Sequence, residues 1–263
     1  MLAQRVVSAL VLAPLLVLAV AAGGWWYVAV AAVATALASR EIYLLLASAD
    51  FVPLWPFGTA LALALVVGAY TGVAQVWPAA LALALTLSLT YLAVRQESDR
   101  SFADWATTWV PPLYPSSLLS LLVLVRMVPS GDRWVYLVLA VTWATDIAAY
   151  VVGRTLGRHP FFPQVSPHKT LEGAIGGLIG GSVTGSLVAY FLGWNSPLVV
   201  AFSMAGAVAA VLGDLGESVV KRQLEAKDTG GLIPGHGGVL DRMDSMLFVG
   251  VVAYFWMSWV GGF

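Results

Sequence analysis

Long apolar runs make up most of this chain, and short polar segments separate them. Runs of roughly 20 apolar residues can cross a ~30 Å hydrocarbon core as helices, and the period-two alternation of barrel strands is absent. The pattern therefore predicts an all-α, polytopic integral membrane protein with about nine transmembrane helices. We expect these helices near residues 6–22, 25–48, 54–71, 76–94, 109–128, 134–152, 171–192, 197–216 and 239–262.

The composition agrees with a membrane protein and removes several classes of function. The 263 residues are 60% hydrophobic and 10% charged, whereas a soluble domain is typically about 25% charged. Because there is no cysteine, disulfides, thiolate nucleophiles and Cys-ligated zinc are excluded. The net charge of −1 says nothing about nucleic acid, but no basic tail is present, and we expect no nucleic-acid partner. The run 6–22 resembles a signal peptide, but further spans follow, so we expect a retained first helix.

Lysines and arginines are distributed unevenly between the two sides of the membrane in this arrangement. Most of them fall on the side of the N-terminus, and Arg126 and Arg133 lie near the other side. The positive-inside rule then places the N-terminus in the cytoplasm and the C-terminus outside. Arg40 and Glu41 interrupt the second run, and two interpretations stay open. They mark its cytoplasmic end, or they form a pair that faces the bundle interior.

The charged residues divide the chain into two parts. Residues 1–133 are predicted to be N-terminal transmembrane helices that form a scaffold, and residues 134–263 to be catalytic helices and cytoplasmic loops. Residues 146–244 hold 15 of the 27 charged side chains and every lysine and histidine. Charge is costly beside hydrocarbon, so such a concentration indicates a site.

The first candidate constellation lies between residues 146 and 173. Asp146 is expected about two helical turns inside the membrane interface, either as a functional carboxylate or as a structural partner of Arg154. Ser166, Lys169 and Thr170 precede a predicted helix, whose free N–H groups suit a phosphate. The alternative is that Thr170 is only an N-cap. The glycines that follow at four-residue spacing, from 173 to 185, predict close helix packing.

Two further constellations lie between residues 213 and 245. On a helix, Asp214 shares one side with four other polar side chains (Ser218, Lys221, Arg222 and Glu225), although these charges could merely neutralise one another. A glycine-rich turn then leads to Asp241 and Asp244, three residues apart. Together with Asp214 they could hold Mg²⁺, which takes one or two protein carboxylates, or they could cap a helix. His236 could contact a phosphate, order the loop or transfer a proton.

The polar positions of these segments resemble a known signature. The run Ser218-x-x-Lys221-Arg222-x4-Lys227-Asp228-x-Gly230-x2-Ile233-Pro234-x-His236-Gly237-Gly238-x-Leu240-Asp241-Arg242-x-Asp244 is similar to that of phosphatidate cytidylyltransferases, or CDP-diacylglycerol synthases. Ser166-Pro-x-Lys169-Thr170-x-Glu172-Gly173 and Gly213-Asp214-x-x-Glu217-Ser218 are similar too. The resemblance covers the second half of the chain.

This resemblance implies an inner-membrane enzyme, described as a homodimer, with a polar cavity open to the cytoplasm. The reaction implied is transfer of CMP from CTP to phosphatidic acid, which gives CDP-diacylglycerol and pyrophosphate and requires Mg²⁺. It further implies a dinuclear metal centre at Asp214 and Asp241, with Asp244 the next candidate. From its position within an apolar helix, we expect Asp146 to be a further metal or network residue.

The remaining assignments divide into two groups. The catalytic candidates are Asp214, Lys221, Arg222, Lys227, Asp228, His236, Asp241, Arg242 and Asp244. The substrate-binding candidates are Ser166, Lys169, Thr170, Glu172, Glu217, Ser218, Gly237 and Gly238. A CTP-dependent polyprenol kinase, a CDP-archaeol synthase and a cation transporter are the alternatives, and the run from Lys227 to Asp244 argues against the first two.

Overall fold

A computed structural model describes residues 2–73, 75–95, 102–235 and 237–260. Across these ranges the secondary structure is helical and contains no strand, which confirms the all-α prediction. The chain forms two compact units. The first comprises Met1–Met127 and Asp228–Asp241, and the second comprises Val128–Lys227 and Arg242–Phe263.

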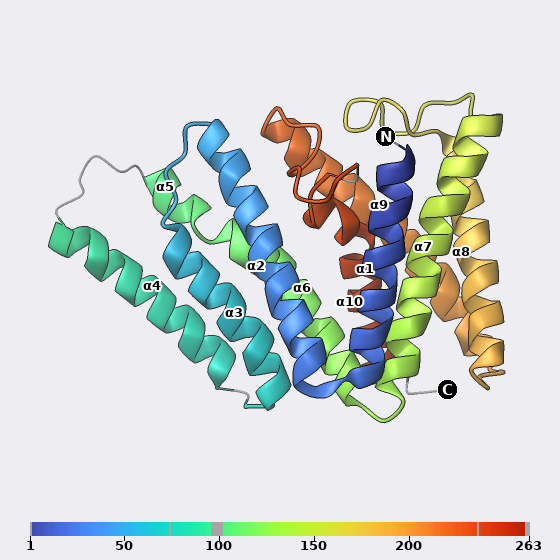
Figure 1. The fold of residues 1–263 in the computed structure, drawn as a ribbon, viewed down its shortest axis with the longest axis horizontal. Coiled ribbons are helices and arrows are strands. Elements are labelled where there is room, and N and C mark those ends of the chain that lie inside the picture. Colours follow the sequence, from blue (N-terminus) through green and yellow to red (C-terminus); the bar gives the residue numbers. More distant parts are fainter. Residues whose placement is uncertain (1, 74, 96–101, 236, 261–263) are drawn as a thin grey trace. The chain divides into compact units, whose positions relative to one another are not determined.

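The first unit is built around α3 (Trp55–Thr71), which packs against α2 (Gly24–Ser48), α6 (Val110–Met127) and α4 (Val76–Arg95) (Figure 1). The helices α1 (Leu2–Ala22) and α5 (Phe102–Thr107) contact α2 and α6, respectively. A cluster that includes the buried side chains of Leu61, Leu65, Ala84 and Trp109 joins α3, α4 and the segment around α5. Their apolar composition on all sides suits helices that are surrounded by other helices or by lipid.

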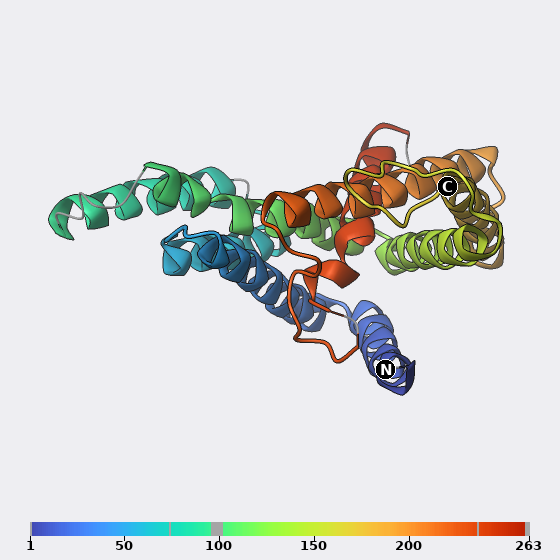
Figure 2. The ribbon, with the colours of Figure 1, turned by 90° about the horizontal axis from the view of Figure 1, so that it is seen from above.

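The second unit contains α7 (Gly131–Leu156), α8 (Leu171–Phe191), α9 (Pro197–Gln223) and α10 (Asp244–Trp259). The helices α7 and α8 run side by side, and α9 contacts both of them and α10 (Figures 1 and 2). Ser196 begins α9 by accepting a hydrogen bond from the N–H of Leu198. The helix continues past the predicted span end at residue 216, as the polar spacing from Asp214 predicts, but it ends at Gln223, so Glu225 lies outside it.

The helices occur at each predicted apolar run, but fewer of them qualify as membrane spans. Six helical segments in the described ranges are long and apolar enough to cross a membrane: Gly24–Ser48, Val76–Val94, Phe102–Met127, Gly131–Leu156, Leu171–Phe191 and Pro197–Gln223. Leu10–Ala22 and Trp55–Thr71 are shorter apolar helices, and α10 has 16 residues. The structure therefore supports a polytopic membrane protein with six candidate spans rather than nine.

The glycine stripe of α8 forms a packing surface, as predicted. Gly177 and Gly181 are buried, and a Cβ atom on Gly177 would lie 3.0 Å from the Cβ of Ala149 on α7. A Cβ atom on Gly181 would overlap the hydroxyl of Thr145 and approach Ala207 on α9. Small residues at these positions let the helix backbones approach closely.

We expect Gly181→Ala to lower the thermal unfolding midpoint in detergent, because overpacking a tight interface costs about 1–3 kcal/mol. Gly216→Ala is the matched control in the same unit, since its Cβ would lie 3.5 Å from Phe248, an ordinary contact. Equal midpoints for the two variants would contradict this packing account.

Candidate active site

Three aspartates of the second unit come together from three helices and form the acidic cluster: Asp146 on α7, Asp214 on α9 and Asp244 on α10. Their carboxylates lie close enough to repel one another. The hydroxyl of Ser245 donates to Asp146 at 3.3 Å, whereas Arg154 donates to Tyr150. Asp146 therefore faces the other aspartates, and the arrangement expected of a structural partner of Arg154 is not seen.

Positive side chains accompany the acidic cluster. The Nζ atom of Lys169 lies 2.9 Å from an Oδ1 atom of Asp214, and the charge of Arg242 acts on Asp146. On α9, Lys221 pairs with the fully buried Glu217 at 3.1 Å. This Lys–Glu pair is buried, so it differs from the neutralisation on a solvated helix end that was the alternative interpretation of the α9 charges.

The segment before α8 is held by its own polar residues. Thr170 is the N-cap of α8, because its hydroxyl accepts a hydrogen bond from the N–H of Gly173 at 3.1 Å. Glu172 accepts hydrogen bonds from the N–H groups of Arg158 and His159 and also contacts the His159 ring. The backbone of Ser166 takes part in the turn that leads to Lys169. This fold of the segment directs Lys169 toward Asp214.

The residues 228–241, which we call the signature loop, pack beside α2 in the first unit (Figure 2). Glu41 of α2 is only 3% exposed. Its carboxylate accepts hydrogen bonds from the N–H groups of Val239 at 2.7 Å and Leu240 at 2.9 Å, and from the hydroxyl of Thr229 at 3.2 Å. A buried carboxylate needs such donors, because an unpaired buried charge is very unfavourable.

Asp241 binds the same loop from within. Its Oδ2 atom accepts hydrogen bonds from the N–H and the hydroxyl of Thr229, each at 2.9 Å, and from the N–H of Gly238 at 2.8 Å. The Asp241 side chain is buried and lies in the short 3₁₀ turn Leu240–Arg242. It therefore fixes the shape of the glycine-rich turn whatever else it binds.

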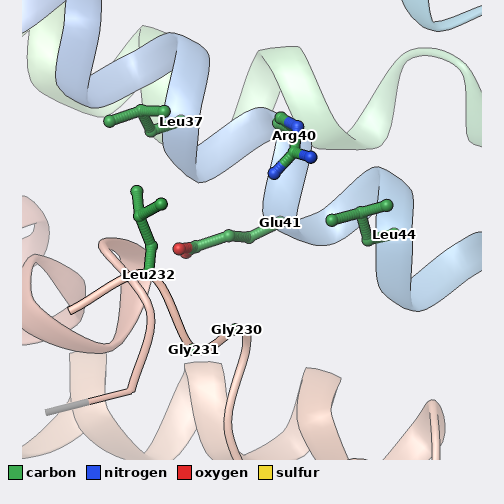
Figure 3. A pocket seen from close by; sticks show the side chains of 7 residues that line it. All are labelled: Leu37, Arg40, Glu41, Leu44, Gly230, Gly231 and Leu232. Atoms are coloured by element: carbon green, nitrogen blue, oxygen red, sulfur yellow. The ribbon is translucent and has the colours of Figure 1, made fainter. Parts of the chain in front are cut away.

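Glu41 also borders a pocket of about 220 Å³ in the first unit. Figure 3 shows its side chain extending from α2 toward the loop backbone near Gly230 and Gly231. The leucines that line this pocket are Leu37, Leu44 and Leu232, and Arg40 is exposed. Of the two interpretations left open by the sequence, Glu41 follows the one in which it faces the protein interior. Its partner, however, is the signature loop and not Arg40.

The predicted site residues thus fall into both units. The second unit brings together Asp146, Asp214, Asp244 and Lys169, whereas Asp241 belongs to the first. Within the described ranges, no three His, Asp or Glu side chains form a ready coordination shell. The donor set nevertheless fits a hard divalent cation, because Mg²⁺ uses one or two protein carboxylates and otherwise water or substrate phosphates.

His236 and Glu41 stand apart from the other residues of the signature-loop region. His236 lies outside the described residues, so its three predicted roles stay open. The contact of Glu41 with the signature loop was not predicted, although the sequence carried a signal for this residue. An ionisable residue within an apolar helix is a functional candidate, and Glu41 stands in the short polar interruption Ser39-Arg40-Glu41 of an otherwise apolar run.

Comparison with known proteins agrees with these features. The model of a cytidylyltransferase family matches residues 3–260. A phosphatidate cytidylyltransferase of Mycobacterium bovis is 33% identical over 247 residues, which cover 87% of this chain and 79% of the relative. One from Brucella suis is 44% identical over 142 residues, or 52% of each chain, so the match spans about half the length of that relative. The chain belongs to the cytidylyltransferase family.

Proposed function

We propose that the protein transfers CMP from CTP to phosphatidic acid and releases pyrophosphate. The observation that carries this proposal is the acidic cluster with Lys169 beside it, which places carboxylates and a cation together among apolar helices. Such a set suits a metal–triphosphate substrate. The names of the relatives, which are phosphatidate cytidylyltransferases, support the same substrates.

The proposed chemistry needs no nucleophilic side chain. A phosphate oxygen of phosphatidic acid forms a bond with the α-phosphorus of CTP. The bond from that phosphorus to the α,β-bridging oxygen breaks, and its electron pair leaves with pyrophosphate. Because the lipid phosphate is already an anion, the protein has to align the two substrates and offset their negative charge.

Basic residues would perform this alignment. Arg222 and Lys227 are exposed near the end of α9 and Arg242 is exposed before α10, so each can reach a phosphate. We assign phosphate contacts to these residues and to Lys221, and we keep Ser166, Lys169 and Thr170 as the proposed clamp on one phosphate. The Thr170 hydroxyl already accepts a hydrogen bond as the N-cap of α8, so it would contact the phosphate only as a donor. Asp228, Glu172, Glu217, Ser218, Gly237 and Gly238 would shape the site.

We propose Asp214, Asp241, Asp244 and Asp146 as the residues that hold Mg²⁺, and a second ion as the resemblance implies. When bound, the metal would supply positive charge to the triphosphate and to the leaving pyrophosphate. The mutual repulsion within the acidic cluster supports this assignment, because a cation would relieve it. Asp241 already accepts hydrogen bonds on Oδ2, which is how ligating carboxylates are commonly oriented.

We also propose an inner-membrane location, with the N-terminus, the active-site loops and a polar cavity on the cytoplasmic side and the C-terminus outside. The uneven distribution of lysine and arginine supports this orientation. CTP would then reach the site from the cytoplasm and phosphatidic acid from the adjacent leaflet. The homodimer is part of the proposal and rests on the resemblance alone.

The test is to supply the purified protein with phosphatidic acid and CTP labelled on either the α- or the γ-phosphorus. We expect the α-label to enter the lipid and the γ-label to appear in pyrophosphate. We also expect a metal chelator to stop transfer and added Mg²⁺ to restore it. Entry of the γ-label into lipid would refute the proposal and indicate a kinase. A cation flux without any labelled lipid would indicate a transporter.

A further inference from the structure

We propose that Glu41 is a positioning residue for the reaction, acting through the signature loop. This inference rests on the proposed function, because the loop begins next to Lys227 and ends at Asp241, two of the proposed site residues. Glu41 is itself distant in sequence, 188 to 199 residues before its three hydrogen-bond partners. It therefore connects the loop to α2, and residues within the loop itself could not make this connection.

The hydrogen bonds of Glu41 determine the backbone path directly before Asp241. Its Oε1 atom accepts from the N–H of Val239, and its Oε2 atom accepts from the N–H of Leu240. Both oxygens are thus used on consecutive peptide groups, which fixes the orientation of the turn. Figure 3 shows the carboxylate directed at the loop and away from the helix that carries it.

Thr229 couples Glu41 to Asp241. Its hydroxyl lies 3.2 Å from Oε2 of Glu41 and 2.9 Å from Oδ2 of Asp241. A hydroxyl has one hydrogen to donate, so the two carboxylates compete for it, and the orientation of each depends on the other. Glu41 therefore sets the direction of the Asp241 carboxylate in two ways, through this hydroxyl and through the backbone.

The packing of the loop glycines supports a precise fit. A Cβ atom on Gly230 would lie 3.0 Å from Oε1 of Glu41, and one on Gly238 would lie 2.5 Å from Oε2. The loop backbone thus lies directly against the carboxylate, without space for a larger residue or an altered rotamer. A carboxylate that only marked the cytoplasmic end of a membrane span would not need to pack so closely against the loop backbone.

The kinetic test compares Glu41→Gln with wild type in the full-length protein. The glutamine side chain presents its NH₂ group to the N–H of either Val239 or Leu240. Two donors then face each other, so one hydrogen bond is replaced by repulsion. We expect kcat/KM for CTP to fall about 10- to 100-fold, the range seen when the partners of ligating residues are removed, with a clear rise in KM. A merely structural role would reduce the amount of active protein, lowering the apparent kcat at unchanged KM, and that result would overturn the inference.

The control is Asp50→Asn, which removes a carboxylate from an exposed position in the same unit. Asp50 has φ +63°, a conformation that asparagine also accepts, so its kinetics should match wild type. If Glu41→Gln does not fold, Thr229→Val tests the coupling, and Thr229→Ser should restore wild-type KM because it keeps the hydroxyl. Equal KM values for the valine and serine variants would overturn the coupling.

Hydrogen–deuterium exchange in detergent without substrate provides a readout that does not require activity. In Glu41→Gln we expect faster exchange in peptides that cover 229–241 and unchanged exchange in peptides from α3. If wild type transfers no CMP but the loop still exchanges faster in the variant, the proposed function fails and the loop connection stands. If wild type is active and the variant shows neither faster exchange nor a higher KM, the positioning inference fails alone.

Discussion

Asp214→Asn is expected to lower kcat for CMP transfer by roughly 10²- to 10³-fold, the range for losing one preorganised electrostatic contact. The amide keeps the shape of the side chain but removes its charge, which pairs with Lys169 at 2.9 Å and acts on Asp146 and Asp244. The fold should survive, because the Asp214 side chain is 40% exposed and an ion pair with this exposure contributes little stability. The measurement is initial-rate kinetics with phosphatidic acid in mixed micelles.

Asp132→Asn is the matched control for this variant. Asp132 lies in the first turn of α7, 14 residues before Asp146, and undergoes the same chemical change in the same unit. We expect wild-type rates for it. Wild-type rates for Asp214→Asn as well would remove Asp214 from the site and leave the acidic cluster without a role in the reaction.

Gly238→Ala is expected to have the second large effect. A Cβ atom at this position would overlap the Thr229 hydroxyl and lie 2.5 Å from Oε2 of Glu41. The loop would have to move away from both buried carboxylates, each of which would lose hydrogen bonds. We expect the rate of CMP transfer to fall by about 10- to 100-fold, which is the usual loss when a contact that supports a ligating residue is removed. Kinetics and exchange of the 229–241 peptides would measure it.

Gly231→Ala tests whether this effect comes from crowding. Gly231 lies in the same loop, and a Cβ atom there would meet no atom within 4 Å. We expect normal transfer and normal exchange for this variant. If both alanine variants were equally impaired, loss of glycine flexibility in the loop would explain the result, and the tight fit against Glu41 would not.

The helices of this protein are predictable because each depends on a local pattern. Apolar runs gave the position of α2, α7 and α9, and the glycine spacing gave the packed face of α8. The count of nine membrane spans is not supported, because Leu10–Ala22 and Trp55–Thr71 are short in the described ranges and α10 begins only after the turn that contains Asp241 and Arg242. A helix shortened in this way cannot be recognised from hydropathy, since the turn residues include apolar ones.

The site was predictable only where its residues sit in recognisable motifs. Asp146 and Lys169, both singled out by their motifs, lie near Asp214 in the second unit, whereas their predicted roles stay predictions. The hydrogen bonds between Glu41 and the signature loop were not predictable, because no pattern in either segment indicates a contact with residues almost 200 positions away. The same holds for the assignment of Asp241 to the first unit, which depends on how Thr229 and Gly238 fold around its carboxylate.

The measurement that tests the central claim most directly counts both products of one reaction. Purified protein would receive CTP, phosphatidic acid and Mg²⁺, and CDP-diacylglycerol and pyrophosphate would be quantified in the same samples. We predict one pyrophosphate for each CDP-diacylglycerol throughout the time course, and neither product without phosphatidic acid. Release of CDP and phosphate, or consumption of CTP without a cytidine-containing lipid, would contradict CMP transfer as the function of this protein.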